Sequence, residues 1–249
     1  MSGHSKWATI KHKKGAADAK RGRVFTKLIR EITVAARMGG GDGNANPRLR
    51  KAVADAKAQQ MPADTITRAI KRGTGELEGA SYEEVLYEGI GPGGTLLLVE
   101  AVTDNRNRTV AELRKIFEKH NGSLGSSGSA AWAFERKGVF RIDAATDESA
   151  LMDIAIETGA DDYELAGDSW QVLSPVEAFD AVTKALESAK VAIVESGLEY
   201  IPKNKKFVVG RDAEVVINMT DALDEHDDVQ NVFADFDISD TEMARISGS

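Results

Sequence analysis

Apolar positions near the start of the chain recur with the spacing of an amphipathic helix. Between residues 23 and 37 they fall within an arc of roughly 140°, and they are Val24, Phe25, Leu28, Ile29, Ile32, Ala35 and Ala36. The opposite side carries Arg23, Lys27, Arg30 and Arg37. The pattern predicts a helix with one face that packs and another that presents four cationic groups.

Two shorter helices are expected after a glycine-rich linker at residues 39–43. Asn46 and Pro47 indicate a helix start, because asparagine accepts hydrogen bonds from free amides and proline suits the first helical position. A third helix is predicted over residues 62–73. Residues 3–22 have no amphipathic period and contain two glycines, so they are expected to form a mobile or weakly helical arm.

From Tyr82 onward the apolar spacing changes to the two-residue period of strands. Strands are predicted at residues 84–90 and 95–103, joined by a glycine-rich turn. A helix around residues 110–117 and a third strand at 129–134 follow. These elements indicate one antiparallel sheet with a covering helix.

Residues 138–201 contain six elements in the order strand, helix, strand, strand, helix, strand. This is the order of the ferredoxin-like arrangement. A further helix around residues 215–223 and a strand at 229–236 are too few to form a stable sheet alone. They are expected to complete the sheet of residues 81–134, which makes the segment between them an insertion.

The predicted fold class is α+β multidomain, with an N-terminal helical domain followed by two α/β sandwich domains. The last domain is ferredoxin-like and inserted into the middle one. The expected boundaries are residues 1–80 for the basic arm and helical domain, 81–134 plus 207–238 for the middle domain, and 135–206 for the inserted domain.

Charge is distributed unevenly between these parts. Residues 1–80 hold 17 of the 32 Lys and Arg but 7 of the 40 Asp and Glu, whereas the other 169 residues hold 15 against 33. A basic segment on an acidic body is typical of a protein that meets a polyanion. The expected partner is nucleic acid, either duplex DNA or ribosomal or transfer RNA, and the ribosome is a further candidate.

The candidate nucleic-acid-binding residues run through the arm and the first two helices. They are Lys6, Trp7, Lys11, His12, Lys13, Lys14, Lys20, Arg21, Arg23, Lys27, Arg30, Arg37, Arg48, Arg50 and Lys51. A solvated helix face is the ordinary alternative for a lone basic run, but the density of like charge upstream favours a polyanionic partner. Trp7 either stacks on a base or docks the arm onto the helices, and docking is favoured.

The start of the helix after residue 103 carries a candidate anion site, formed by Asn105, Arg106, Asn107 and Arg108. Two arginines occupy the positive end of a helix dipole, where acidic residues are the stabilising choice. Free backbone amides and guanidinium groups together can bind an anion. An ion pair between Arg108 and Glu112, one turn later, is an equal alternative.

No catalytic motif accompanies these residues. The four histidines lack the short spacings of a metal site, cysteine is absent, and no nucleophile elbow or phosphate loop occurs, so no metal, cofactor or enzymatic activity is expected. The acidic run from Asp221 to Asp228 is expected to be a solvated surface. No apolar run reaches membrane length, and a cytoplasmic monomer without membrane contact is expected.

Several runs of residues along the chain are distinctive. They are Gly3 to Trp7, Ile10 to Lys14, Lys20 to Arg23, Asn46 to Arg50, Met61-Pro62, Arg68 to Gly75, Tyr87 to Gly94, Thr103 to Thr109 and Asp227 to Gln230. These runs resemble the YebC family. Together they span nearly the whole chain. Gln60 and Ile90 stand where that family commonly has asparagine and an aromatic residue.

The resemblance implies a three-domain cytoplasmic protein with a role in gene expression. Family members are described as DNA-binding transcriptional regulators, and others look like ribosome-associated translation factors, including a mitochondrial activator of cytochrome oxidase subunit synthesis. The residues do not choose between DNA and RNA, because neither a clear helix-turn-helix nor an aromatic RNA-recognition signature is present. The many basic residues favour contacts to the nucleic-acid backbone, which carry no sequence information directly.

Overall fold

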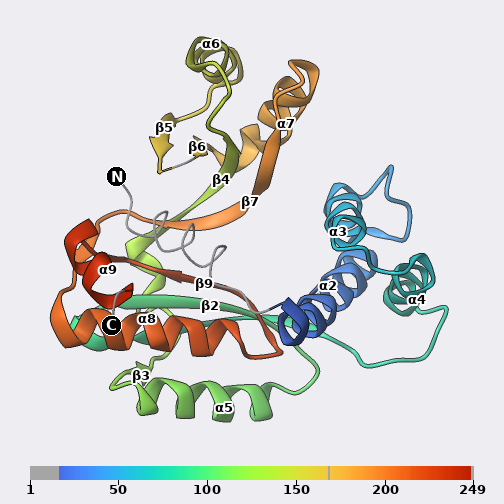
Figure 1. Cartoon of the computed structure of the whole chain (residues 1–249). Helices are drawn as coiled ribbons and strands as arrows, with labels where there is room; N and C mark the ends of the chain where they lie inside the picture. The colour runs from blue at the N-terminus through green and yellow to red at the C-terminus, as the bar shows by residue number, and fades with distance from the viewer. Residues whose placement is uncertain (1–16, 168, 248–249) are drawn as a thin grey trace.

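The computed structural model describes residues 17–167 and 169–247, which form three groups of elements (Figure 1). The first group is helical and consists of α2 (Ala17–Gly39), α3 (Pro47–Ala58) and α4 (Ala63–Thr74). Helix α2 begins before residue 23, so the expected arm is corrected for residues 17–22, which belong to the helix. Alanine, lysine and arginine dominate this stretch, and their helix propensity is high even without an apolar period. The remainder of the expected arm lies outside the described residues.

The three helices share one apolar core made of the residues that the helical spacing selected. Ile32, Leu49 and Ile66, one from each helix, are almost fully buried. Helices α2 and α4 approach closely at Gly73, where a Cβ atom would lie 2.3 Å from the carbonyl oxygen of Thr33. Only glycine permits this contact, which fixes the orientation of α2 and hence of its basic face.

The predicted start of α3 is confirmed. The side chain of Asn46 accepts a hydrogen bond from the amide of Leu49 at 3.1 Å and donates to the carbonyl oxygen of Ala35 at 2.8 Å. Gln60, in the turn before α4, adopts a φ of 59°. Asparagine adopts this left-handed conformation more readily than glutamine, so Gln60 occupies a position that is better suited to asparagine.

The second group is a four-stranded sheet in the order β3-β1-β2-β9. Its strands are β1 (Glu83–Ile90), β2 (Leu96–Thr103), β3 (Ser123–Leu124) and β9 (Val229–Ala234), and the 3-10 turn η1 (Pro92–Gly94) joins β1 to β2. Helices α5 (Arg106–Lys119) and α8 (Gly210–Asp224) cover one face of the sheet (Figure 1). The antiparallel pairings of β2 with β1 and with β9 confirm the expected hairpin and show that two distant segments share one sheet.

The predicted strand at residues 129–134 is wrong for all but its last residue. Residues 131–133 form the 3-10 turn η2 (Ala131–Ala133), and the third strand of the sheet is the short β3 instead. The buried carboxylate of Glu88 accepts hydrogen bonds from the amides of Gly128, Ala130 and Ala131 at 2.6 to 2.7 Å. Amides that bind a side chain are not available to a strand ladder, so a turn forms.

The third group repeats the predicted order of six elements. They are β4 (Phe134–Asp143), α6 (Glu148–Thr158), β5 (Asp162–Ala166), β6 (Ser169–Ser174), α7 (Phe179–Ser188) and β7 (Ile193–Pro202), with the 3-10 turn η3 (Val176–Ala178) before α7. The sheet is antiparallel in the order β5-β6-β4-β7. Both helices pack on one face of it, around Phe140, Trp170 and Leu186.

Strands β4 and β7 extend beyond this sheet towards the second group (Figure 1). They pair from Phe134 opposite Pro202 onward, whereas β6 joins β4 only at Gly138. Residues 134–137 and 199–202 therefore form a two-stranded ribbon. Its inner end packs on the uncovered face of the second group's sheet through Phe134 and Tyr200.

The remaining described elements pack against the core of the second group. Strands β8 (Lys206–Phe207) and β10 (Phe236–Asp237) pair in parallel, and the helix α9 (Asp240–Ser247) was not expected from the sequence. In the part of the chain that the structure describes, no helix is both long enough and apolar enough to cross a membrane.

Candidate functional site

The basic side of α2 faces the acidic turn between α8 and β9. Lys27 Nζ lies 3.2 Å from Asp224 Oδ1, and Arg23 Nη2 lies 3.3 Å from Glu225 Oε1. Further along the helix, Arg37 donates to the carbonyl oxygen of Tyr82 at 2.6 Å. The helix therefore directs its cations towards the second group of elements. We call this contact, between the basic side of α2 and the acidic segment 224–228, the α2 junction.

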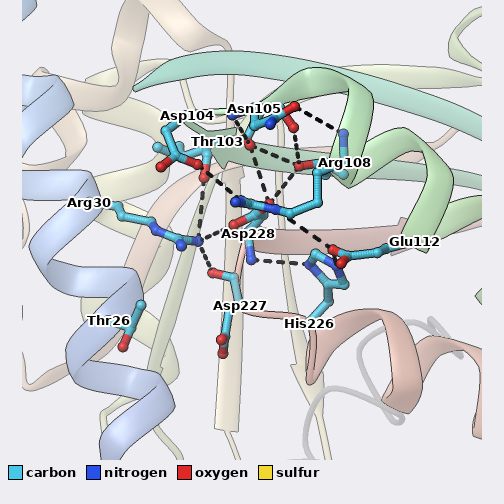
Figure 2. A network of polar contacts seen from close by, with 12 residues as sticks. Thr26, Arg30, Thr103, Asp104, Asn105, Arg108, Glu112, His226, Asp227 and Asp228 are labelled. Atoms are coloured by element: carbon cyan, nitrogen blue, oxygen red, sulfur yellow. Dashed lines mark hydrogen bonds and ion pairs between the residues drawn. The ribbon is translucent and has the colours of Figure 1, made fainter. Parts of the chain in front are cut away.

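Asp228 lies at the centre of the α2 junction and is only 2% exposed. Figure 2 shows Arg30 from α2 and Arg108 from α5 pointing at its carboxylate from opposite sides. Arg30 Nη1 lies 2.7 Å from Oδ1 and Arg108 Nη2 lies 2.8 Å from Oδ2. The hydroxyl of Thr109 donates to Oδ2 at 2.5 Å. One carboxylate thus connects the helical group to the start of α5.

These contacts keep Asp228 ionised despite its burial. Desolvation is the largest single influence and would raise the pKa of Asp228. The hydrogen bonds from Thr109 and Arg108, with the charges of Arg30 and Arg108, outweigh it and lower the pKa below its ordinary value of 3.8. The site therefore holds a buried anion shared by two guanidinium groups, a strong arrangement when fully hydrogen-bonded.

Arg30 makes further contacts that fix its position. It donates to the carbonyl oxygen of Asp227 and lies over the ring of Tyr82, 5.5 Å from its centroid. Its side chain is 12% exposed, and among the described residues its buried Nε atom has no hydrogen-bond partner. Most of its binding capacity is therefore used within the chain.

His226 and Glu112 extend the network on the side of Arg108. The amide of Asp228 donates to His226 Nδ1 at 3.1 Å, so the ring proton of neutral histidine is on Nε2, which donates to Glu112 Oε2 at 2.9 Å. Within the described chain, Glu112, His226 and Asp228 are close enough to hold a metal ion. Both ring nitrogens are already bonded, however, and two arginines share the Asp228 carboxylate, so this chemistry favours an ion-pair network.

A cleft of about 550 Å³ opens beside this network, between α2 and the turn after α8. Its lining includes Arg23, Arg30 and Arg108, but also Glu225, Asp227 and other carboxylates. A lining of both signs does not match a polyanion. The cleft is better explained as the open margin of the α2 junction.

The candidate anion site at the start of α5 is largely occupied by internal partners. Asn105 Oδ1 caps the helix by accepting from the amide of Arg108 at 3.1 Å. Arg108 lies 3.0 Å from Asp104 and 3.9 Å from Glu112, so the alternative ion pair exists beside the shorter one to Asp228. Arg106 is the open member of the set, with its side chain 61% exposed and 3.8 Å from Glu83; Asn107 is exposed beside it.

The other candidate residues fall into four sets. Arg48 is held by Glu31 at 2.7 Å and by Glu84 at 2.6 Å. Arg50 and Lys51 lie on the outer side of α3, where their described partners are the Gly43 carbonyl oxygen and Asp55. Lys20 and Arg21 belong to α2. Six candidates lie outside the described residues: Lys6, Trp7, Lys11, His12, Lys13 and Lys14.

The expectation of a solvated acidic run at residues 221–228 is wrong for Asp224 and Asp228, because they are partners of Lys27 and of Arg30 and Arg108. Sequence reasoning also missed the roles of Thr109 and Glu88. The one signal in the sequence for these ion pairs was complementary charge, because the acidic run and the basic helix face each have a high density of charge, of opposite sign. About 200 residues separate them, and no local pattern reports such a contact.

The fold and this junction define a class of three-part α+β proteins with a basic helical beginning joined by ion pairs to an acidic body. A model of the "TACO1/YebC protein N-terminal domain" matches residues 5–76, and a model of the "TACO1/YebC second and third domain" matches residues 82–236. The chain belongs to the TACO1/YebC family, which confirms the resemblance seen in the sequence.

Curated relatives and a solved structure agree with this assignment. A protein of Desulfatibacillum aliphaticivorans is 54% identical over 241 residues, 96% of this chain and 98% of the relative. A protein of Geobacter sulfurreducens is 54% identical over 246 residues, 99% of this chain and all of the relative. Both carry the name "Probable transcriptional regulatory protein". The crystal structure of a conserved hypothetical protein from Aquifex aeolicus is similar with a TM-score of 0.87 and 45% identity, covering 94% of this chain and 98% of that one.

Proposed function

We propose that this protein is a nucleic-acid-binding regulator of gene expression, acting as a DNA-binding transcriptional regulator through its basic N-terminal part. The observation that carries the proposal is the surplus of ten positive charges in residues 1–80, on a body with a surplus of 18 negative charges. The names of the curated relatives support it. We expect a cytoplasmic monomer that acts without a cofactor and without catalysis.

Partners from distant parts of the chain divide the candidate residues into two sets. Direct contact is proposed for Lys6, Trp7, Lys11, His12, Lys13, Lys14, Lys20, Arg21, Arg50 and Lys51. Of these, Arg50 and Lys51 have only local partners, in the loop before α3 and within α3. The other set, Arg23, Lys27, Arg30, Arg37 and Arg48, is held by more distant residues of the chain. These residues can contact a polyanion only in exchange for those partners, so we assign them chiefly to positioning α2 and α3.

A second candidate function is a ribosome-associated translation factor that binds ribosomal or transfer RNA and promotes peptide synthesis. The orientation of α2 favours it, because a helix whose basic face is directed at the second group of elements is not free to read a major groove. The contacts then consist of basic side chains against phosphate groups, which give affinity with little sequence information.

The experiment compares a variant that neutralises four basic residues of the arm and early α2 with a control of equal charge change. The first carries K11Q, K13Q, K14Q and K20Q; the control carries K115Q, K119Q, K184Q and K190Q, all outside the proposed contact set. We expect the first variant alone to bind a 30-base-pair random duplex more weakly. The slope of log affinity against log salt should become less negative by about 0.9 for each phosphate that the protein no longer neutralises.

The two functions are separated with the wild-type chain at one salt concentration. A transcriptional regulator should bind a specific promoter site roughly a thousand-fold or more tighter than random duplex. A translation factor should cosediment with ribosomes and show no such preference. Equal binding by the arm variant and its control would contradict the proposal as a whole.

A further inference from the structure

A large aromatic side chain is exposed at the base of the two-stranded ribbon. Trp132 is 66% exposed, although it lies between Ala130 and Ala133, which are 0% and 8% exposed. Burying such a ring would contribute substantially to a core. The chain instead directs it outward from a well-packed segment, so its position calls for an explanation other than folding stability.

The ring is held in place by its surroundings. Its Nε1 atom donates to the carbonyl oxygen of Ser129 at 3.1 Å. The loop before it is fixed by Glu88, whose carboxylate receives three backbone amides. Burial would raise the pKa of Glu88, but these three hydrogen bonds together lower it, so the carboxylate is ionised at neutral pH. An aromatic side chain presented from a rigid loop loses little entropy on binding.

A basic segment contacts the backbone on which this ring is carried. The amide of Lys203 donates to the carbonyl oxygen of Ala133 at 2.9 Å, and its Nζ donates to the carbonyl oxygen of Trp132 at 3.0 Å. Residues 203–207 are all exposed, and Phe207 at the end of the segment is 75% exposed. We call Trp132, Lys203, Lys205, Lys206 and Phe207 the Trp132 surface.

In the part of the chain that the structure describes, no carboxylate forms a direct ion pair with the lysines of this surface, although they stand on a body with a large surplus of acids. The backbone amide of Lys206 donates to the carbonyl oxygen of Asp235 at 2.7 Å, but the side chain of Asp235 is buried and its Oδ1 accepts from the amide of Leu96 at 2.8 Å. The ammonium groups of Lys203 and Lys206 donate only to the carbonyl oxygens of Trp132 and Gly94, at 3.0 and 3.1 Å. Three exposed lysines that keep their positive charge, together with the exposed rings of Trp132 and Phe207, suit an anionic, aromatic ligand.

We propose that the Trp132 surface binds an unpaired stretch of nucleic acid, with a base stacked on Trp132 and phosphates contacted by Lys203 and Lys205. The inference rests on the proposed function and adds a second contact to it, about 110 residues away in the sequence from the basic arm. Single strands fit because their base faces are accessible, and stacking on aromatic rings with flanking positive charge is how such strands are bound. A duplex hides those faces.

The test measures binding of the full-length chain to a labelled 12-nucleotide oligouridine and to a labelled 12-base-pair duplex by fluorescence anisotropy. Trp132→Ala should weaken oligouridine binding by roughly ten-fold, within the range found for loss of one stacked base, and leave duplex binding unchanged. Trp132→Phe should retain most of the affinity. Ile156→Ala, which truncates an apolar side chain that is 74% exposed on α6, serves as the control.

A charge variant provides an independent measurement. Lys203→Gln with Lys205→Gln should reduce the salt dependence of oligouridine binding by about 0.7 for each phosphate that is no longer neutralised, whereas K115Q with K119Q should not. An unchanged affinity in Trp132→Ala, or an equal loss for oligouridine and duplex, would overturn the inference. A wild type that binds neither ligand would overturn the proposed function as well, so the two failures are distinguishable.

Discussion

The α2 junction and the Trp132 surface are both rich in basic residues, yet they have opposite consequences. At the α2 junction, Arg30 and Lys27 meet carboxylates from a turn some 200 residues downstream, and Asp228 is buried between two guanidinium groups. At the Trp132 surface, the neighbouring acids Glu88 and Asp235 are occupied by backbone amides. Fixed pairs cancel the field that steers a polyanion, whereas unpaired lysines maintain it.

A basic run in a sequence is therefore not by itself a positive surface. What decides is whether carboxylates from elsewhere in the fold reach the same groups. The α2 face therefore contributes to holding the molecule together, and the Trp132 surface is available to a ligand. Each prediction below changes one side of this comparison and measures whether stability or binding responds.

The largest effect is expected at the centre of the α2 junction. Asp228→Asn removes the charge shared by Arg30 and Arg108 and should lower the free energy of unfolding by about 3–5 kcal/mol, as for other buried pairs that lose one partner. Urea denaturation followed by circular dichroism measures it. Glu225→Gln, at the 64% exposed end of the same junction, should cost less than about 1 kcal/mol. Equal losses in the two variants would show that Asp228 is not the centre of the contact.

The pH dependence should reveal the same carboxylate. Because the folded-state pKa of Asp228 is lowered from 3.8, its contribution is fully present above that pH and is lost as pH falls through the folded pKa. The stability difference between wild type and Asp228→Asn should therefore be constant from pH 7 to 5 and shrink below about pH 4. A stability difference that stays the same down to pH 3 would show that protonation of Asp228 does not cause the loss of stability.

A smaller loss is expected beneath the Trp132 surface. Glu88→Gln replaces an ionised acceptor of three amides and should cost roughly 1.5–3 kcal/mol, the range for hydrogen bonds to a charged group. Amide hydrogen exchange at Gly128, Ala130 and Ala131 should become faster in the same variant. Glu187→Gln, exposed on α7, is the matched control and should change neither quantity. If exchange at these amides is unaffected, Glu88 does not hold the loop.

The smallest effect on stability is expected for the lysines themselves. Lys205→Gln should change the free energy of unfolding by no more than about 0.5 kcal/mol, since the side chain is exposed and outside any ion pair in the described chain. Thermal unfolding monitors this. A marked destabilisation would show that Lys205 stabilises the fold, as the basic residues of α2 do, and that it is not simply available to a ligand.

Much of the fold could be predicted because it rests on local periodicity. The helical face from Leu28 to Ala36, the Asn46 cap and the β1–β2 hairpin all follow from spacings of a few residues, and each is present. The order of elements in residues 134–202 was also correct. The errors occurred where a distant residue decides the local structure, as Glu88 does for the loop at 128–131.

The candidate site was less predictable for the same reason. The sequence identified the basic residues of α2 but could not identify their partners, because Asp224 and Asp228 are adjacent to α2 only after the second sheet has formed. Sequence reasoning considered Glu112 as the partner of Arg108, since it lies one turn away, and the structure adds a closer one, Asp228, from the turn before β9. Trp132 gave no signal in the sequence, because its exposure depends on the turn that replaces the expected strand.

The two-stranded ribbon of residues 134–137 and 199–202 connects the third group of elements to the second, so a small bend in the ribbon moves the far end of the third group by a larger distance. Ten residues of strand extend about 33 Å at roughly 3.3 Å per residue, so a bend of about 10° at the inner end moves the outer end by about 6 Å. Trp132 lies at that inner end, immediately before Phe134 begins β4. A tilt of that size therefore displaces α6 and α7 by more than the spacing of about 4.8 Å between neighbouring strands.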